Sequence, residues 1–581
     1  MSEQSISHGE VWKTRLCFGL FGVVLLVLFG RLAWLQGFRA VDNRRSVDRA
    51  QTLRDPLPTA RGTILDRHGR PLAYDRPVMV VRGEFQARVP KGIRRIPLEV
   101  LDLLATRLAA HASAGREDGP ARAELRRALL NRMHRAPHRL LPSNHKTRDF
   151  LQVDFLVAGA LDAHDAVRRL RAEVERWRTD RSLPGRLHLR FIDELSRTYP
   201  DREFTLGPIG NFFIAAQKKV RRGKRVDLQS IEGFTGLEAC RGLWPCDAAG
   251  QADFCEIEFK DSRRRRYWTG IGKRPESPSA LATSIDLDLQ KLAHAELRSA
   301  AAAVEAHYRS SYQWGTMVLV DVASGGILAM ASHYPGRKGA APNAAVESSF
   351  EPGSVVKPLV IALALENGKV SPDEQIDCTP TRPGRGRPVS GFPERVIYDD
   401  HACGPLDIHG ILINSSNIGA VSVGTRLGRT GLKDYLVRYG FCTRTRLGLP
   451  GEVPGARPGG IAGIDKLSET QLGRYTAPSL SFGYELNVTA AQLARAYLSM
   501  LSGVRRELHL VRTISRAGKS VEWVEPRGAR FLSDHTVARI RAAMVDVVSD
   551  KAEQATGRHL FTMLRKLGYD YDLIGGKTGT A

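Results

Sequence analysis

The stretch FEPGSVVKPL, residues Phe350–Leu359, places a serine and a lysine three residues apart behind a Pro-Gly pair. The Pro-Gly pair ends the preceding element, and the apolar residues Val355–Leu365 predict a helix that is buried on most sides. At this spacing Ser354 and Lys357 share one face of the helix's first turn. Pro358 fits there, because a proline in the first turn removes only an N–H that has no intrahelical partner.

This serine and lysine suit nucleophilic catalysis. A serine hydroxyl is a poor nucleophile until a base takes its proton, and burial against apolar residues lowers the pKa of a lysine enough for that role. The N–H groups at the start of the helix would stabilise an oxyanion. A single S-x-x-K is nevertheless expected about once or twice by chance in a chain of this length. Alone, the stretch leaves open whether it is a nucleophile site or only the start of a buried helix.

Two further motifs follow it in the chain. INSSNIGA, residues Ile413–Ala420, contains Ser415 and Asn417, a hydroxyl and an amide that can bridge the first pair to a substrate amide. GGKTGTA at the chain end contains Lys577, which supplies a positive charge, and Gly579, which lets a substrate backbone approach closely. An ordered set of S-x-x-K, a serine-containing triplet and K-T-G is typical of β-lactamases and penicillin-binding proteins. The set favours the nucleophile site.

Length and charge set limits on the whole chain. At 581 residues it is too long for one ordinary core, so two or more domains are expected. Its net charge of +24 lies partly in the runs Lys218–Arg225 and Arg263–Arg266. Neither run has zinc-ligand spacing or a recognition-helix pattern, so solvated arginine-rich faces are favoured over nucleic-acid binding. Attraction to anionic lipid or acidic wall polymers is the second option.

An apolar run near the N-terminus predicts a membrane span. Leu16–Gly30 is uninterrupted and continues after Arg31 as LAWLQ, about 20 residues in all, which is enough to cross a bilayer. No small-x-small cleavage site follows directly, and Trp34 is typical of an interfacial anchor. We therefore expect an uncleaved signal anchor. Basic residues stand on both sides of the run, so charge alone leaves its orientation open.

The seven cysteines leave two alternatives open. Cys378 and Cys403 flank a Gly/Pro-rich excursion that a disulfide could close, if this part lies outside the plasma membrane. Free buried thiols are the other alternative. The segment Cys240–Cys246 lacks the paired C-x-x-C clusters of a zinc site, so no metal is predicted. The remaining cysteines are Cys17, Cys255 and Cys442.

The order of elements predicts an α+β fold with helices packed on an antiparallel sheet. RGTILDRHGRPLAYD, residues 61–75, is typical of a strand, a turn and a second strand. Residues 97–196 are rich in Leu, Ala and Arg at helical spacing, which predicts a peripheral helical insertion. Residues 272–280 predict a linker, and residues 316–332 predict a hairpin around Ser-Gly-Gly.

The chain resembles a class B penicillin-binding protein, the monofunctional peptidoglycan D,D-transpeptidase family. RRSVD at residues 44–48 favours its division-type, FtsI-like branch. The resemblance covers nearly the whole chain. It rests on RLAWLQ (31–36), RGTILDRHGRPLA (61–73), RTYP (197–200), GFTGLE (233–238), SIDLDLQ (284–290), FEPGSVVKP, SSNIG, SFGY (481–484) followed by VTAAQLARAY, and KTGT.

The resemblance implies a domain plan: a cytoplasmic tail (1–14), a transmembrane signal anchor (15–36), a non-catalytic elongated pedestal (37–275) with the 97–196 insertion, and a transpeptidase domain (281–581). The catalytic part would lie on the outer, periplasmic side of the inner (plasma) membrane. The implied partners are peptidoglycan stem peptides as D-Ala-D-Ala donor and amine acceptor, β-lactams, and a membrane glycan polymerase of the FtsW/RodA type. Neither a cofactor nor a metal nor nucleic acid is implied.

The resemblance also assigns roles to residues. Ser354 would attack the D-Ala-D-Ala carbonyl and become acylated, and Lys357 would be the base. Ser415 and Asn417 would relay protons and hold the donor amide. Lys577, Thr578 and Gly579 would bind the donor's carboxylate side and backbone. The N–H groups of Ser354 and Thr580 would form the oxyanion hole.

Two departures from the family pattern stand out. The family commonly has glycine after SFGY, whereas this chain has Glu485 followed by Leu486 and Asn487. Ala581 follows KTGT directly, where the family continues with strands and a closing helix. From the second departure we expect the chain to be a truncated form of a longer product that ends after the K-T-G strand, and that as given binds penicillin poorly or misfolds. The alternative functions are a D,D-carboxypeptidase or β-lactamase-type hydrolase and a non-catalytic homologue or scaffold.

Overall fold

A computed structural model describes most of the chain. The described residues are 8–36, 52–58, 61–91, 94–112, 119–136, 138–141, 148–161, 172, 185–210, 212–221, 224–233, 235–240, 243, 254–262, 265–271, 278–308, 312–337, 342–384, 386–455, 476–516, 518–526, 528–549, 554–569 and 573–580. The RRSVD motif, Cys246, Ala581 and most of the predicted linker 272–280 lie outside them.

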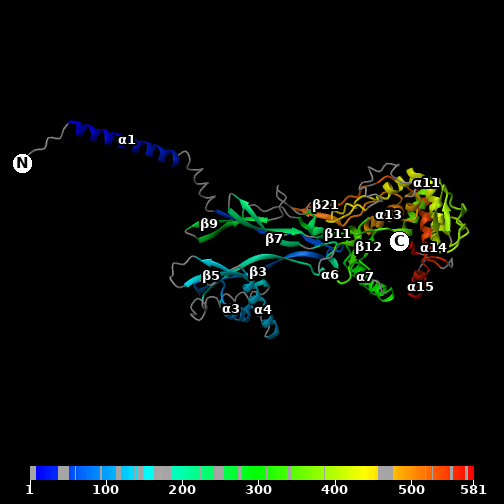
Figure 1. Cartoon of the computed structure of the whole chain (residues 1–581), viewed down its shortest axis with the longest axis horizontal. Helices are drawn as coiled ribbons and strands as arrows, with labels where there is room; N and C mark the ends of the chain where they lie inside the picture. The colour runs from blue at the N-terminus through cyan, green and yellow to red at the C-terminus, as the bar shows by residue number, and fades with distance from the viewer. Residues whose placement is uncertain are drawn as a thin grey trace, which may run out of the picture. The chain divides into compact units, whose positions relative to one another are not determined.

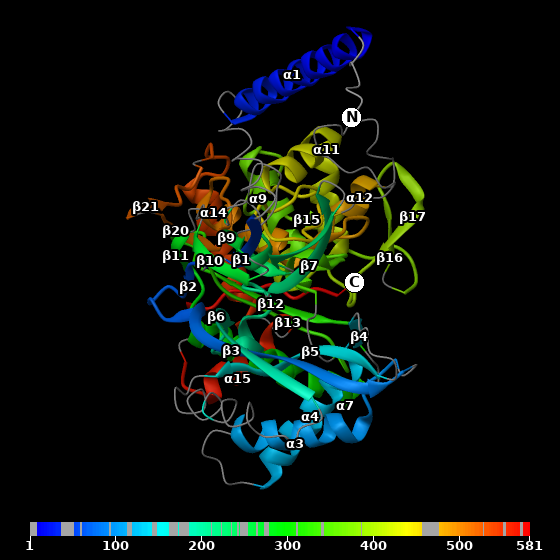
Figure 2. The ribbon, with the colours of Figure 1, turned by 90° about the vertical axis from the view of Figure 1, so that its left-hand side faces the viewer.

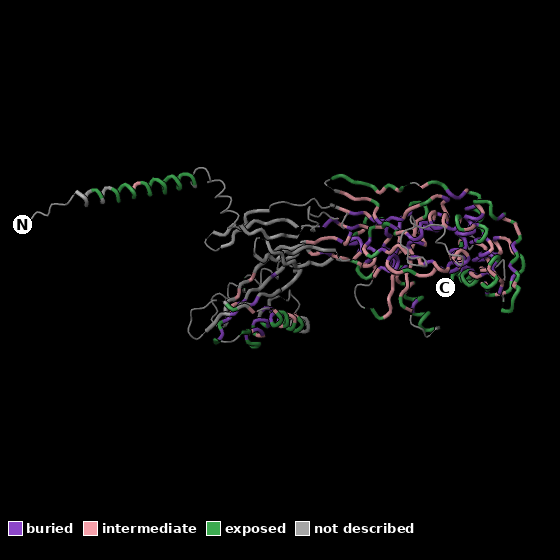
Figure 3. Tube along the Cα trace, turned by 45° about the horizontal axis from the view of Figure 1, so that its top comes forward, coloured by how far each residue is buried: buried purple, intermediate pink, exposed green. Residues whose placement is uncertain are grey.

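The first helix, α1 (His8–Gln36), contains the predicted span (Figure 1). Its segment Leu16–Trp34 is long and apolar enough to cross a membrane, and it buries none of its surface in the protein. Figure 3 shows α1 exposed along almost its whole length. Exposed Phe, Leu and Val side chains on every face are stable only in an apolar surrounding, so α1 is a candidate membrane helix.

The described residues form two compact units. The first comprises Met1–Thr59, Ile214–Ile231 and Pro245–Glu276, and the rest of the chain forms the second. In the first unit a three-stranded antiparallel sheet has the order β1-β9-β10, and β7 pairs with β8. The bounds are β1 (Thr52–Pro58), β7 (Phe212–Arg221), β8 (Lys224–Gly233), β9 (Phe254–Ser262) and β10 (Arg265–Ile271).

The second unit contains a sheet with the strand order β21-β20-β11-β2-β3-β5-β4, in which β6 also pairs with β3. The strands are β2 (Thr63–Leu65), β3 (Pro71–Pro90), β4 (His138–Leu141), β5 (Arg148–Leu161), β6 (Gly185–Thr198), β11 (Pro278–Thr283), β20 (Val511–Arg516) and β21 (Lys519–Glu522). β2 and β3 are joined by a turn at residues 66–69, as predicted. β11 runs parallel to β2 and antiparallel to β20, so residues 278–280, predicted as linker, belong to a strand.

The predicted helical insertion, residues 97–196, is only half helical. α3 (Leu98–Ala112) and α4 (Gly119–Arg135) pack together against β5 around a core that includes Leu104 and Leu129 (Figure 2). The second half was predicted wrongly, because it forms β4, β5 and β6. Leu151 and Val153 are buried at a spacing of two, and β5 pairs along its length with β3. That pairing satisfies the backbone as strand.

The residues after β11 form the predicted mixed α+β arrangement. The hairpin of β12 (Gly315–Val320) and β13 (Ile327–His333) is antiparallel, and α7 (Leu287–Tyr308) packs on it. Helices surround a large apolar core whose centre is α9 (Lys357–Glu366), buried from Lys357 to Ala364. The other described α-helices after β11 are α8 (Ala344–Glu347), α10 (Ile408–Ile413), α11 (Asn417–Arg438), α12 (Thr476–Ser481), α13 (Ala490–Ser502), α14 (Asp534–Val547) and α15 (Arg558–Lys566).

Three predictions need comment here. The segment 574–580, predicted to hold K-T-G on a strand, belongs to neither a helix nor a strand, because it forms no ladder with another described strand and a strand requires such a partner. Cys378 and Cys403 are both buried and form no disulfide. Of the two alternatives for these cysteines, the structure therefore shows free thiols. The compact units divide the chain differently from the boundaries 37–275 and 281–581, which stay predictions.

Candidate active site

Ser354 lies on a short 3-10 turn, η2 (Gly353–Val356), that continues directly into α9. The SFGY loop packs against this turn: the Gly353 N–H donates to the Gly483 carbonyl at 3.1 Å. Gly483 has φ +92°, and a Cβ there would lie 1.9 Å from the Gly353 carbonyl oxygen. Only glycine combines this backbone conformation with so close an approach. The SFGY glycine therefore sets the position of the nucleophile turn.

Two buried tyrosines hold the other side of the turn. The Tyr497 hydroxyl, from α13, donates to the Val355 carbonyl at 2.7 Å, and the Tyr439 hydroxyl donates to the Leu359 carbonyl at 3.2 Å. Burial raises the pKa of both hydroxyls far above the ordinary value, so both remain neutral donors. Ser354 itself is half-buried, on the open side of a fixed turn.

Lys357 is fully buried at the start of α9. Its Nζ donates to the Ser415 carbonyl at 2.5 Å, to Asn417 Oδ1 at 2.7 Å and to Ser415 Oγ at 3.2 Å. Burial, and secondarily the charge of Lys577, lowers the pKa of Lys357 to about 7. A neutral amine is therefore accessible near neutral pH, which the sequence motif alone could only suggest.

The Ser-Ser-Asn triplet is positioned by Asp399, a residue that the sequence analysis missed. Asp399 is 5 % exposed, and its carboxylate accepts hydrogen bonds from the Ser416 hydroxyl (2.6 Å) and from the N–H groups of Asn417 (2.6 Å) and Ile418 (3.0 Å). These N–H groups begin α11, so Asp399 caps the helix that carries the triplet. The only signal in the sequence was a pair of acidic residues 18 positions earlier, which no local pattern connects to the motif.

The backbone and side chain of the triplet are both fixed. Ser415 has φ +52°, an uncommon conformation for a residue with a side chain. The Asn417 amide group donates from Nδ2 to the Tyr398 carbonyl at 2.8 Å, so that Oδ1 faces Lys357. Strain of this kind persists where the surrounding contacts hold it, and it is common at functional sites.

The K-T-G segment lies over the same place. Lys577 Nζ donates to Ser415 Oγ at 2.9 Å and to the Thr578 carbonyl at 2.8 Å. Burial lowers the pKa of Lys577 to about 8. A Cβ on Gly579 would lie 2.7 Å from Val355 Cγ1, so the segment passes close to the nucleophile turn. Thr578 and Thr580 are exposed beside it.

The structure thus brings the sequence-predicted residues together from three separate segments. The Ser354 turn, Lys357, the Ser415–Asn417 triplet, Lys577 and Gly579 form one connected group. In the part of the chain that the structure describes, no three His, Cys, Asp or Glu side chains gather in the geometry of a metal site.

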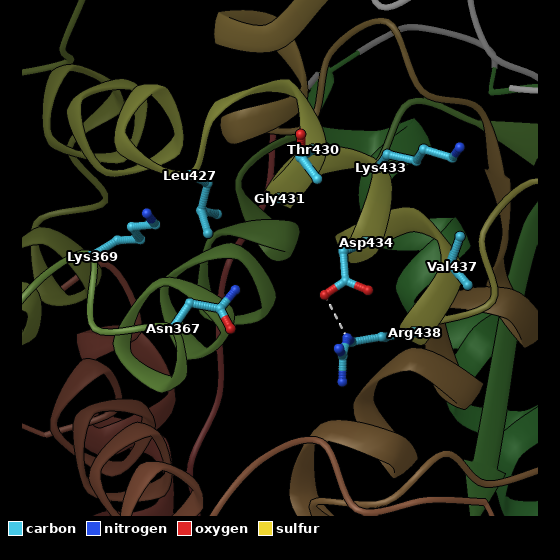
Figure 4. Close-up of a pocket in the computed structure, with 9 residues that line it drawn as sticks. All are labelled: Asn367, Lys369, Leu427, Thr430, Gly431, Lys433, Asp434, Val437 and Arg438. Atoms are coloured by element: carbon cyan, nitrogen blue, oxygen red, sulfur yellow. Dashed lines mark hydrogen bonds and ion pairs between the residues drawn. The ribbon is translucent and has the colours of Figure 1, made fainter. Parts of the chain in front are cut away.

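A hollow of about 500 Å³ lies elsewhere, between the residues that directly follow α9 and the C-terminal half of α11 (Figure 4). Its charged lining includes Lys369, Lys433 and Arg438, and Arg438 Nε donates to Asp434 at 2.5 Å. None of the predicted site residues lines it. The residues that line the hollow include no serine and none of the three motifs, so the candidate site is the group around Ser354.

The group combines a half-buried serine on a turn that leads into a helix, a buried lysine with a pKa near 7, a Ser-x-Asn bridge and a second lysine. This combination is the one expected of a serine acyltransferase. Comparison with known proteins agrees. Residues 315–581 match the family model described as the penicillin binding protein transpeptidase domain.

Two curated relatives extend the match beyond that domain. The chain is 31 % identical over 510 residues to peptidoglycan D,D-transpeptidase FtsI of Escherichia coli K12, covering 86 % of this chain and 73 % of the relative. It is 28 % identical over 602 residues to the probable peptidoglycan D,D-transpeptidase PenA of Neisseria meningitidis serogroup A, covering 100 % and 84 %.

A solved structure agrees on the fold. Penicillin Binding Protein 2X from Streptococcus thermophilus aligns with a TM-score of 0.58 at 19 % identity, covering 87 % of this chain and 68 % of that one. The chain belongs to the class B penicillin-binding proteins and is FtsI-like within them. The family, and with it the mixed α+β transpeptidase fold, is confirmed.

Proposed function

We propose that this enzyme is a peptidoglycan D,D-transpeptidase that cross-links stem peptides through an acyl-enzyme on Ser354. The observation that carries the proposal is Lys357: it is fully buried, its pKa is about 7, and its amine contacts both Ser415 and Asn417. The family membership and the names of the relatives support the same reaction.

In the acylation step, Ser354 Oγ attacks the carbonyl of the penultimate D-Ala while neutral Lys357 takes the hydroxyl proton. The C–N bond then breaks, and the departing D-Ala amine receives a proton through Ser415. The N–H groups of Ser354 and Thr580 bind the oxyanion, and one such donor is typically worth about 10²–10³ in rate. Lys577 and Thr578 bind the terminal carboxylate, and Gly579 allows the donor backbone to approach.

In the second step an amine from a neighbouring stem peptide attacks the Ser354 ester. A C–N bond forms, the C–Oγ bond breaks, and the amine's proton returns to Ser354 by way of Lys357 and Ser415. Asn417 holds the donor amide, because its side chain is fixed between Lys357 and the Tyr398 carbonyl. β-Lactams would inhibit the enzyme by acylating the same serine.

The membrane arrangement is part of the proposal. Residues 15–36 would anchor the chain in the inner membrane with residues 1–14 in the cytoplasm, and the catalytic part would face the periplasm. α1 supports this by its length and apolar surface. Residues 37–275 would act as a pedestal, and a membrane glycan polymerase of the FtsW/RodA type would be the partner, at cell division.

Labelling with a fluorescent penicillin tests the function. We expect a long-lived adduct on Ser354 in the full chain and none in Ser354→Ala. Rapid loss of the label would favour a carboxypeptidase or β-lactamase, and a folded chain that takes no label would favour a scaffold. Mass spectrometry of the labelled peptide identifies the serine.

A further inference from the structure

Glu485 is the residue of the SFGY loop that the proposed reaction does not use. It stands where the family commonly has glycine, and its backbone is left-handed with φ +58°. That conformation is unfavourable for a residue with a side chain, so glycine would suit the backbone better than the glutamate that is present. Glu485 is one of the residues that line a pocket of about 450 Å³.

The pocket adjoins the candidate active site on two sides. Glu351, which lines it, stands three residues before Ser354, and its carboxylate accepts from the Glu485 N–H at 3.0 Å. Tyr398, which also lines it, holds Asn417 through its carbonyl. A molecule in this pocket would therefore lie beside the nucleophile turn and beside the amide that contacts Lys357.

Acidic and basic side chains are neighbours in the pocket. Glu351 and Glu485 contribute carboxylates, and Arg395 from β17 (Phe392–Tyr398) contributes a guanidinium. Ser479 connects them: Arg395 donates to its hydroxyl, and that hydroxyl donates to Glu485 Oε1 at 3.0 Å. Ser479 is buried, and its hydroxyl holds the guanidinium of Arg395 and the carboxylate of Glu485 next to each other.

This arrangement matches an amine that has a carboxylate close to it. Two carboxylates attract an ammonium group, and the five N–H donors of a guanidinium allow a carboxylate to bind beside Ser479. We propose that the pocket is the acceptor site of the enzyme, and that it selects an acceptor stem peptide whose attacking amine belongs to an amino-acid end with its own carboxylate. The inference rests on the proposed transpeptidase function and names its second substrate.

The acceptor amine loses two protons as it becomes an amide. The acceptor binds as an ammonium ion and gives one proton to solvent. Its neutral nitrogen forms the C–N bond to the acyl carbon as the C–Oγ bond to Ser354 breaks, and its second proton passes to Ser354 Oγ. Glu485, Glu351 and Arg395 bind the acceptor and take no part in bond making. They determine which amine competes with water for the acyl-enzyme.

The test measures how the acyl group is partitioned. The full chain in detergent receives a thioester of an acyl-D-alanine as donor, with D-alanine as acceptor or D-alanine amide, which lacks the carboxylate. The amounts of amide and hydrolysis products give the acceptor's half-saturating concentration. We expect Glu485→Gln and Arg395→Gln to raise that concentration for D-alanine about tenfold, because each removes a charge-assisted contact. Arg395→Gln should also remove the preference for D-alanine over its amide.

Two further variants provide a control and a second test of Glu485. Glu522→Gln changes an exposed carboxylate on β21 and should behave as the unmodified chain. Glu485→Gly restores the family's residue and relieves the backbone, so it should lose acceptor binding as Glu485→Gln does. A Glu485→Gly chain with normal acceptor binding would contradict the proposal.

Penicillin acylation of each variant serves as the internal reference, because it needs no acceptor. The proposal requires the half-saturating concentration to change more than the acylation rate. Unchanged partitioning with Ser354 still acylated would overturn the acceptor site alone. A longer-lived acyl-enzyme in Glu485→Gln without any acceptor would also overturn it, since Glu485 would then activate water. Failure of Ser354 to acylate in the unmodified chain would instead overturn the proposed function.

Discussion

Lys357 and Lys577 direct their amines to the same oxygen, the Ser415 hydroxyl, from 3.2 Å and 2.9 Å. Two ammonium groups this close repel each other, and Lys357 is fully buried while Lys577 is half-buried. Burial is the main reason that their pKa values fall to about 7 and about 8, and for Lys357 the charge of Lys577 contributes further. At neutral pH one amine can therefore act as base while the other stays charged, and Ser415 can pass a proton between them.

Replacing Lys357 with arginine should abolish acylation. A guanidinium stays protonated at any accessible pH, so the base is lost although the charge remains. We expect the rate of penicillin acylation to fall by at least about 100-fold, the range of general-base catalysis. The measurement is the second-order acylation rate, with circular dichroism to show folding. The control is Lys369→Arg, which changes an exposed lysine that lines the 500 Å³ hollow. Normal acylation in Lys357→Arg would show that Lys357 is not the base.

The pH dependence of acylation should be bell-shaped. Lys357 must be neutral, so the rate rises as pH increases through about 7. Lys577 must be charged to bind a carboxylate, so the rate falls as pH increases beyond about 8. The two amines are coupled, so both limbs belong to the pair. In Lys577→Arg the alkaline limb should disappear, because arginine keeps its charge. A flat profile between pH 6 and 9 would contradict this assignment.

Replacing Asp399 with asparagine should weaken both stability and catalysis. The amide cannot accept all three hydrogen bonds that the carboxylate accepts, so we expect the free energy of unfolding to fall by about 2 kcal/mol. The negative charge of Asp399 also raises the pKa of Lys357, so its loss should move the acid limb of the pH profile downward. Asp373→Asn, at an exposed site, is the control. If the acid limb of the pH profile does not move in this variant, the role of Asp399 is structural only.

Gly483→Ala should damage the nucleophile turn. The new Cβ would lie 1.9 Å from the Gly353 carbonyl oxygen, on a backbone with φ +92°. We expect a loss of about 3 kcal/mol in the free energy of unfolding, together with slower acylation. Gly391→Ala separates the two causes, since Gly391 has φ +78° but nothing within 4 Å of a Cβ. Equal losses in the two variants would mean that backbone conformation alone is responsible.

Removing residues 1–36 should separate chemistry from cellular function. The structure places no part of Leu16–Trp34 in the protein core, so the shortened chain should keep penicillin acylation within about twofold. It should fail to support growth, because the proposed polymerase partner and the substrate are at the membrane. Growth on the shortened chain, at equal protein levels, would argue against the anchor as a partner site.

The sequence predicted the parts of the site that depend on short spacings. Ser354 and Lys357 are one turn apart, and Ser415 and Asn417 belong to one triplet, so local patterns identify them. The structure brings these residues together with Lys577, although their catalytic roles stay predictions. Asp399 was not predicted because its contact with the triplet depends on the fold of the intervening chain. The contact between Glu351 and Glu485 in the proposed acceptor pocket was not predicted for the same reason.

The fold was predictable where one side of an element is apolar. The 61–75 turn and the 316–332 hairpin formed as expected, because turn residues there stand between β-rich runs. Within the predicted insertion 97–196, the residues of β5 and β6 were mistaken for helix, since their pairing with β3 is long-range and their composition does not reveal it. The K-T-G residues have strand-like sequence, but a strand also needs a partner.

The position of β11 has a consequence for exchanging gene segments between relatives. β11 (Pro278–Thr283) is hydrogen-bonded to β2 on one side and to β20 on the other. A join placed at residue 281 would take half of this strand from one parent and half from the other. Both neighbouring strands would then meet a foreign edge. A hybrid enzyme is better joined so that residues 61–91, 278–283 and 511–516 come from a single parent.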